Sequence, residues 1–136
     1  KKFGSQCIAL SVEAKKMADG KWEAYTDGGR EHTGVDAIEW IKKALDLGVG
    51  EIMITSIDRD GTKKGYEMEL VEAVTSFAPV PVIVHGGAGS MEAIKDVILR
   101  GKADAVSAST VYHYNLFSIA DLKKYLSEQN INVRLI

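Results

Sequence analysis

The chain has 136 residues, of which 46% are hydrophobic and 26% are charged, and its formal net charge is −2. This composition excludes a disordered chain and predicts one folded domain over residues 1–136. Acidic and basic residues are interleaved, so we expect neither nucleic acid nor a membrane as a partner. With a single cysteine, no apolar run of membrane-spanning length and no signal peptide, we expect a soluble, cytoplasmic protein.

Short apolar runs alternate with segments of helical periodicity along the whole chain. Both prolines lie between two such segments, so the chain carries no sign of an internal linker. In chain order we predict a strand at 7–12, a hairpin of 15–17 with 21–26, a helix at 36–47, a strand at 52–55, a helix at 69–77, a strand at 82–84, a helix at 91–100, a strand at 105–108 and a helix at 119–126.

This order of elements predicts an α/β fold with parallel strands and right-handed crossovers. Four strands cannot close a barrel, because the eight-stranded form needs about 250 residues. Two architectures remain open from the pattern alone: a small open sheet, or a (βα)4 half of a TIM (βα)8 barrel with outer helices. A half-barrel would expose an apolar inner face and two sheet edges, so it would pair with another half or with itself.

Three of the predicted strands end in loops of small and polar residues. Parallel strands place their carboxyl ends at one edge, so these loops should meet there. Glycines let backbone N–H groups approach an anion, and a following helix adds the positive end of its dipole. We therefore expect a phosphate-type ligand, although glycine also serves tight turns for steric reasons alone. The loop residues concerned are Thr55, Asp60, Gly61, Gly86, Gly87, Ser109 and Thr110.

Glu13 follows the first predicted strand and should face the same edge. A partly desolvated carboxylate there is suited to general acid or base chemistry. The alternative is a solvated glutamate paired with Lys15 or Lys16. Asp60 could accept ligand hydroxyls or cap its own loop, and for Asp58 we expect the capping role.

His85 ends the third predicted core strand and can face the pocket, although a satisfied histidine at the edge is the commoner outcome. His32 lies in a polar loop, and His113 follows the proposed phosphate loop. The three histidines lack metal-ligand spacing, and Cys7, expected to be an inert core thiol, has no partner. We therefore expect no metal site.

Several motifs resemble the cyclase subunit of imidazole glycerol phosphate synthase. The longest is the run Gly50–Thr62, followed by Gly65 and Tyr66, and within it Ser56–Thr62 is highly specific to this family. The resemblance covers essentially the whole chain and matches strands five to eight, the C-terminal half of a (βα)8 barrel, which favours the half-barrel over an open sheet. The other matching segments are Phe3–Gln6, Gly28–Arg30 with Thr33–Gly34, Gly86–Gly89, Ala103–Ala105 and Asn132–Leu135.

The resemblance implies an enzyme of histidine biosynthesis that needs no metal or organic cofactor. The complete barrel would take ammonia from a glutaminase subunit and convert a phosphorylated ribulosyl aminoimidazole carboxamide to imidazole glycerol phosphate and aminoimidazole carboxamide ribonucleotide. Glu13 stands at the position of one of two catalytic aspartates; the other belongs to the N-terminal half, so we expect the isolated half to be inactive. Glu51 would gate the ammonia channel. Asp60, Gly61 and His85 would contact substrate, and the phosphate would be held by Gly86, Gly87, Ser109 and Thr110. Thr55 is a hydroxyl donor at the same edge that is more often structural than catalytic.

Two departures from the family pattern keep other functions open. Glu13 replaces an aspartate, and His85 stands where the family often has serine. Both would suit a cyclase-like paralogue that supplies ammonia for amidino-sugar synthesis in surface polysaccharide. A non-catalytic, self-pairing, phosphate-binding half-barrel is a third possibility.

Overall fold

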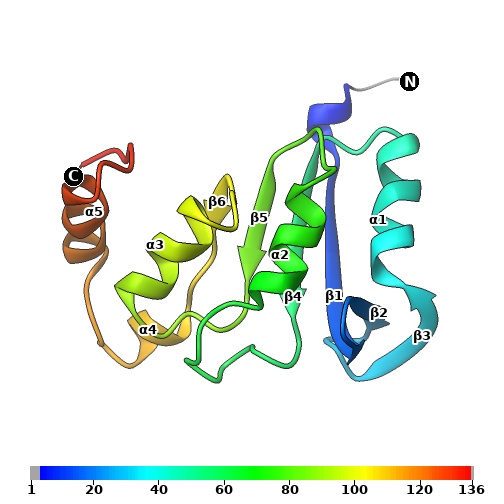
Figure 1. Cartoon of the computed structure of the whole chain (residues 1–136), viewed down its shortest axis with the longest axis horizontal. Coiled ribbons are helices and arrows are strands. Elements are labelled where there is room, and N and C mark those ends of the chain that lie inside the picture. The colour runs from blue at the N-terminus through cyan, green and yellow to red at the C-terminus, as the bar shows by residue number, and fades with distance from the viewer. Residues whose placement is uncertain (1–3, 136) are drawn as a thin grey trace.

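A computed structural model of the chain describes residues 4–135, so Phe3 lies outside the described residues. The elements form one sheet with helices packed on it (Figure 1). The strands are β1 (Ala9–Ala18), β2 (Lys21–Thr26), β3 (Glu31–Asp36), β4 (Glu51–Ser56), β5 (Val82–His85) and β6 (Ala105–Val106), and the helices are α1 (Ala37–Asp46), α2 (Met68–Thr75), α3 (Met91–Leu99), α4 (Thr110–His113) and α5 (Ile119–Glu128).

The sheet has the strand order β3-β2-β1-β4-β5-β6. β1, β4, β5 and β6 pair in parallel, while β2 and β3 extend the sheet as an antiparallel hairpin arm beside β1. The parallel strands lie side by side in chain order, and helices separate them. This is the α/β architecture of half a (βα)8 barrel, and it confirms the predicted fold class.

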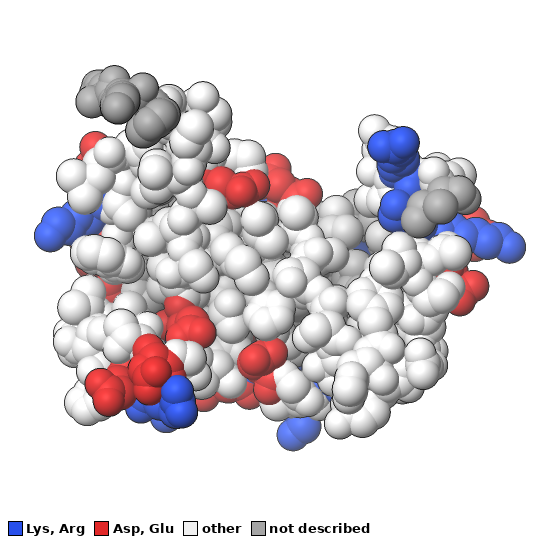
Figure 2. All heavy atoms as spheres, turned by 180° about the vertical axis from the view of Figure 1, so that it is seen from behind, with Lys and Arg blue, Asp and Glu red and all other residues white. Residues whose placement is uncertain are grey.

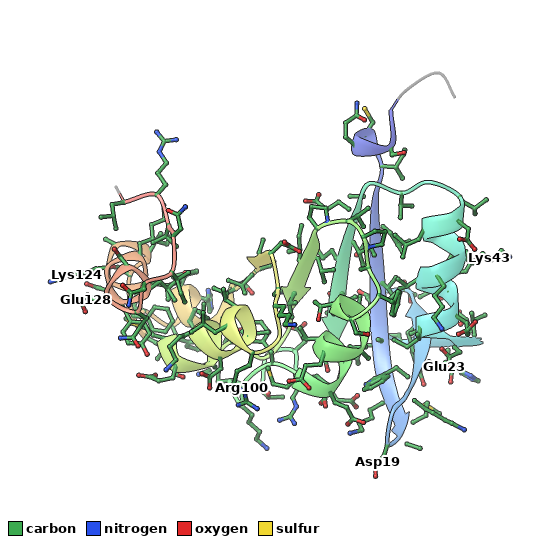
Figure 3. All side chains as sticks on the ribbon, turned by 45° about the horizontal axis from the view of Figure 1, so that its top comes forward. Asp19, Glu23, Lys43, Arg100, Lys124 and Glu128 are labelled. Atoms are coloured by element: carbon green, nitrogen blue, oxygen red, sulfur yellow. The ribbon has the colours of Figure 1, made fainter. Side chains whose placement is uncertain are left out.

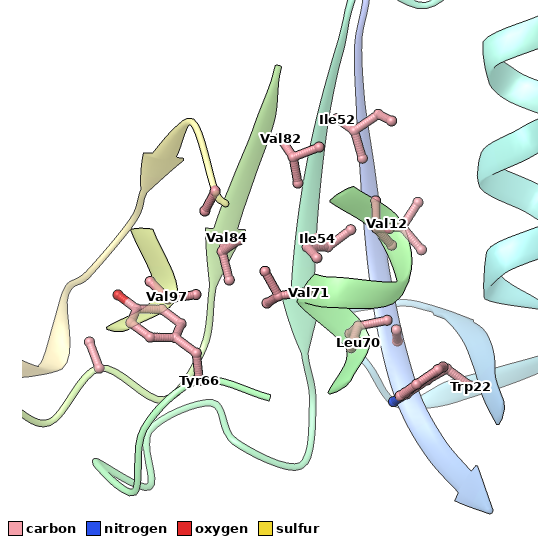
Figure 4. Packing of buried hydrophobic residues seen from close by; sticks show 14 of the residues in the cluster. Val12, Trp22, Ile52, Ile54, Tyr66, Leu70, Val71, Val82, Val84 and Val97 are labelled. Carbon is pink, nitrogen blue, oxygen red and sulfur yellow. The ribbon is translucent and has the colours of Figure 1, made fainter. Parts of the chain in front are cut away.

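One face of the sheet is covered by helices and forms the core. Along β4, Ile52, Ile54 and Ser56 are buried, whereas Glu51, Met53 and Thr55 are half-exposed on the other face. A single apolar cluster joins this covered face to residues of α1, α2, α3 and α5. Figure 4 shows strand side chains meeting those of α2 in this core: Val12, Ile54, Val84, Leu70 and Val71.

Local capping fixes where several helices begin. The Asp36 carboxylate accepts hydrogen bonds from the backbone N–H groups of Ile38 and Glu39 at the start of α1. The Ser90 hydroxyl accepts one from Ala93 N at 3.1 Å, which confirms the predicted cap of α3. Each cap is a short-range signal, so the sequence predicted these boundaries to within a residue or two.

The first predicted strand is wrong at its start. Cys7 lies in a short 3-10 turn, Ser5–Cys7, and is exposed, so it is not a core thiol. Ile8 is also 52% exposed, because the buried side chains of β1 begin only at Val12. An apolar run therefore does not ensure that its first residues are buried. β1 continues into the arm that pairs with β2, so Glu13 lies within the strand and not directly after it.

Three other elements differ from the prediction. β3 is a strand where a polar loop was expected around His32, and all its residues are exposed. The fourth core strand, predicted at 105–108, covers only Ala105–Val106. The chain then forms α4, a short helix that was not predicted. Within residues 4–135, β6 pairs with β5 alone, and the segment Ala9–Val12 of β1 pairs with β4 alone.

The face opposite the helices, here called the open face, is less apolar than expected. Its larger apolar side chains on the parallel strands, Met53 and Ile83, are half-buried, and small or polar residues surround them. Figure 2 shows this side as mostly uncharged, with acidic groups interspersed and basic groups toward the periphery. The charged side chains labelled in Figure 3, such as Asp19 and Lys124, also lie at the outside of the molecule. Among residues 4–135, no helix is long and apolar enough to cross a membrane.

Candidate functional site

Three predicted site residues lie in one line across the open face. Glu13 of β1 is paired in register with Thr55 of β4, which is paired in turn with His85 of β5. All three are half-buried and alternate with core residues of their strands, so they share the open face. β4 and β5 end at or directly after this line. We call Glu13, Thr55 and His85 the rim row, because they lie at the C-terminal edge of the parallel strands.

Within the rim row, Thr55 and His85 are in contact. Thr55 Oγ1 lies 3.4 Å from His85 Nδ1, a distance at the long end of a hydrogen bond. A threonine hydroxyl can donate or accept, so it suits either tautomer of the imidazole. The contact fixes one edge of the ring and leaves Nε2 available to a ligand.

The alternative in which a neighbouring lysine neutralises Glu13 is not seen. Lys16 Nζ binds Glu69 at 2.6 Å, on the other face of β1. Lys15 Nζ lies 5.4 Å from the centre of the Tyr25 ring. Among residues 4–135, the Glu13 carboxylate takes part in no hydrogen bond or ion pair, so it is available to a ligand on the open face.

The rim row continues into the hairpin arm, where the sequence pattern had not placed site residues. Glu13 pairs with Tyr25 of β2, and Tyr25 pairs with His32 of β3. The Tyr25 and His32 rings lie 6.2 Å apart between centroids. The turn alone does not fix which residue lies opposite Glu13, because the register of β1 with β2 shifts between Lys16 and Ala18.

The glycine loop after β5 is packed against the loop after β4. Gly86 and Gly87 are buried and have φ angles of +89° and +108°. A Cβ on Gly86 would lie 2.7 Å from Ser56 O, and one on Gly87 would lie 2.3 Å from Gly65 O. The steric explanation for these glycines therefore holds in full. Anion binding by the same loop stays a prediction.

The loop after β6 approaches the same edge from the other side. Ser109 is exposed and Thr110 begins α4, so their hydroxyl groups flank the turn after β6. Tyr66, from the loop after β4, donates a hydrogen bond through its hydroxyl to Ser107 O at 3.3 Å. Burial raises the pKa of the Tyr66 phenol, which keeps it a neutral donor. Tyr66 thus connects two of the three loops.

Asp60 and Gly61 are exposed in the loop after β4, and Asp58 has a structural role. The Asp58 carboxylate accepts a hydrogen bond from Lys16 N at 2.8 Å, so it anchors β1 rather than its own loop. In the described part of the chain, the Asp60 side chain has no hydrogen-bond partner. Its backbone lies close to Gly86, where a Cβ would be 3.5 Å from Asp60 Cα.

Glu51 lies at the opposite end of β4 from the rim row. It is the first residue of the strand and is half-buried on the open face. It lies four positions before Thr55, which corresponds to about 13 Å along a strand. Glu51 therefore lies at the N-terminal edge of the sheet and cannot join the rim row.

A hollow of about 480 Å³ lies between the β1–β2 hairpin and the loop after β4, outside the rim row. Its walls carry three basic and three acidic side chains, so their formal charges cancel: Lys16, Arg59 and Lys64, and Asp19, Asp58 and Glu67. Arg59 Nε binds Glu67 Oε2 at 3.1 Å, and Glu67 is 8% exposed. None of the predicted site residues lines this hollow.

A sequence model described as "Histidine biosynthesis protein" matches residues 1–118. The chain belongs to the histidine biosynthesis protein family. Members of this family are usually isomerases or cyclases of histidine biosynthesis. The matched range runs from before β1 through α4, so it contains the rim row and all three loops at the C-terminal edge.

Proposed function

We propose that this chain forms the C-terminal half of the barrel of an imidazole glycerol phosphate synthase cyclase. In this proposal the complete barrel uses ammonia from a glutaminase subunit to close an imidazole ring. Its substrate is a phosphorylated ribulosyl aminoimidazole carboxamide. The products are imidazole glycerol phosphate and aminoimidazole carboxamide ribonucleotide.

The observation that carries the proposal is the position of Glu13 in the rim row. Glu13 is half-buried, shares the open face with Thr55 and His85, and forms no ion pair with a lysine among residues 4–135. A carboxylate in this position can exchange protons with a ligand that lies over the C-terminal edge. Active sites of (βα)8 barrels are built at this edge.

The loops after β4, β5 and β6 would supply the binding groups. Asp60 and Gly61 would meet ligand hydroxyls, and the phosphate would lie against Gly86, Gly87, Ser109 and Thr110. Lysine and arginine lie mainly at the periphery of the open face, so phosphate binding by this half would rest on backbone N–H groups and hydroxyls (Figure 2).

Two partners follow from the same proposal. An N-terminal half-barrel would add its strands at β6 and at the Ala9–Val12 edge of β1, which pair on one side only among residues 4–135. A glutaminase subunit would deliver ammonia at the end of the sheet where Glu51 lies. Ammonia would then travel through the closed barrel to the rim row.

The test is ammonia-dependent turnover of the substrate by the complete barrel, with Glu13 intact and with two variants. Glu13→Gln should lower kcat by about 100-fold or more, because it removes the proton-transfer group while keeping the shape. Glu13→Asp should stay active, because it keeps the carboxylate. Activity in wild type that Glu13→Gln does not reduce would contradict the role of Glu13.

A second candidate function is favoured because the two departures from the family pattern, Glu13 and His85, lie close together. Glu13 and His85 each pair with Thr55, so both change the same part of the open face. A cyclase-like paralogue that supplies ammonia for amidino-sugar synthesis would keep the phosphate loops and alter this part. Turnover by Glu13→Asp alone, with a silent wild type, would favour this second candidate.

A further inference from the structure

The imidazole of His85 is held in a way that presents one nitrogen to the open face. Its Nδ1 lies 3.4 Å from Thr55 Oγ1. The residues that follow, Gly86 and Gly87, are buried against Ser56 and Gly65, so the backbone beside the ring cannot shift freely. The ring is therefore fixed both through its side chain and through the turn that follows it, and Nε2 is left for a ligand.

Glu13 and His85 lie on opposite sides of Thr55. Each is one strand away from it in the same register, which places their Cα atoms about 10 Å apart. A reacting group that lies over Thr55 would have a carboxylate on one side and an imidazole on the other. Two side chains of different proton affinity on either side of one point form the arrangement that acid–base catalysis uses.

We propose that His85, oriented by Thr55, is a second proton-transfer group of this pocket and acts together with Glu13. This inference rests on the proposed cyclase function and deepens it. This chain would then supply two proton-transfer groups from the rim row, beside the aspartate that the resemblance assigns to the N-terminal half. Thr55 would be a positioning residue that acts through His85.

The protons balance in the addition of ammonia to a substrate carbonyl. As the new carbon–nitrogen bond forms, the carbonyl π electrons move to oxygen, which takes a proton from the protonated His85 imidazole. The nitrogen, now carrying a positive charge, gives a proton to the Glu13 carboxylate. The result is a carbinolamine, a neutral imidazole and a carboxylic acid.

Loss of water restores the starting state. The Glu13 carboxylic acid protonates the hydroxyl of the carbinolamine, which leaves as water while the nitrogen lone pair forms a carbon–nitrogen double bond. The neutral imidazole then takes a proton from this iminium nitrogen. Ammonia and a carbonyl have become an imine and water, and both side chains have returned to their first forms.

The experiment measures kcat and KM of the complete barrel with the ribulosyl substrate and ammonia. His85→Asn should lower kcat by about 100-fold with little change in KM, because asparagine keeps a polar group but cannot transfer the proton. Free imidazole should restore part of the activity of His85→Ala, which leaves room for it. Thr55→Val should lower kcat by about tenfold through misplacement of the ring, and Thr55→Ser should retain most of it.

His113→Asn is the matched control, because His113 is an exposed histidine outside the rim row and should leave kcat unchanged. A thermal unfolding midpoint for each variant shows whether it folds. If wild type converts the substrate and His85→Asn keeps the wild-type kcat, with or without a change in KM, the role of His85 is overturned while the cyclase function stands. If wild type itself is inactive with this substrate, the cyclase function falls, and the role of His85 falls with it.

Discussion

Gly65 and Gly87 join the loops after β4 and β5 through their backbones. Gly65 N donates a hydrogen bond to Gly87 O at 2.8 Å, and a Cβ on Gly87 would lie 2.3 Å from Gly65 O. The two loops therefore form one unit at the C-terminal edge of the sheet. Any ligand bound there meets a surface whose shape is set by this contact.

The first prediction is that Gly87→Ala destabilises the chain by about 2 kcal/mol or more. The φ angle of +108° strains an alanine, and the clash is with backbone atoms that cannot rotate away. Urea unfolding measures the loss. Gly28→Ala is the control, because Gly28 has a φ of +65° but open space around its Cβ position, so its cost should be about 1 kcal/mol. Equal losses would mean that the loop contact contributes nothing.

The second prediction concerns Tyr66, which bridges the loops after β4 and β6. Tyr66→Phe removes the hydrogen bond to Ser107 O and should cost about 1 kcal/mol in the free energy of unfolding. It should also raise the amide exchange rate of residues 107–110. Tyr114→Phe removes a hydroxyl from a side chain that is 59% exposed, and it should change neither quantity.

The third prediction is a pH dependence at the hairpin. The hydrogen bond from Lys16 lowers the pKa of the Glu69 carboxyl below its ordinary value of 4.5, and Gly20 N adds a second bond to the same carboxylate. A lowered folded-state pKa means that the ionised carboxylate stabilises the fold above 4.5 and that this contribution is lost as pH falls through the lowered value.

Glu69→Gln should therefore show a shallower loss of stability in acid than wild type, together with faster exchange of the Gly20 amide at neutral pH. Glu72→Gln is the matched control, because Glu72 is an exposed glutamate one turn further along α2. An acid unfolding curve of Glu69→Gln that overlays wild type would contradict the prediction.

The fourth prediction concerns the start of β5. Val82 N donates to the Asp104 carboxylate at 2.9 Å, and Asp104 N donates to Val82 O at 3.0 Å. Asp104→Ala should cost about 1 kcal/mol and raise the exchange rate of the Val82 amide. Asp104→Asn keeps an acceptor oxygen, so it should lie close to wild type. If both variants behave alike, the carboxyl oxygen is not the acceptor that matters.

Short-range signals explain what the sequence predicted correctly. Asp36 and Ser90 cap the helices that follow them, and the short continuous apolar runs of β4 and β5 are typical of buried strands. Each of these signals lies within a few residues. They were sufficient for the α/β order of elements and for placing the polar loops at one edge, whereas the resemblance to the cyclase family decided between a half-barrel and an open sheet.

The remaining features depend on contacts between distant segments. The alignment of Glu13, Thr55 and His85 comes from strand pairing across about 30 or more residues, and no local pattern sets that register. Tyr25 lies in the same line through the hairpin, and a register shift between Lys16 and Ala18 prevents its pairing from being counted from the turn. The predicted burial of Cys7 was wrong, because an apolar residue type does not ensure burial.

The central claim is that the ligand lies on the open face across the rim row. The most direct measurement is a backbone amide NMR titration of the complete barrel with the phosphorylated ribulosyl substrate in the absence of ammonia. The account predicts the largest shifts at Thr55, Gly86, Gly87 and Ser109. Shifts centred instead on Lys16, Arg59 and Lys64, which line the hollow beside the hairpin, would contradict it.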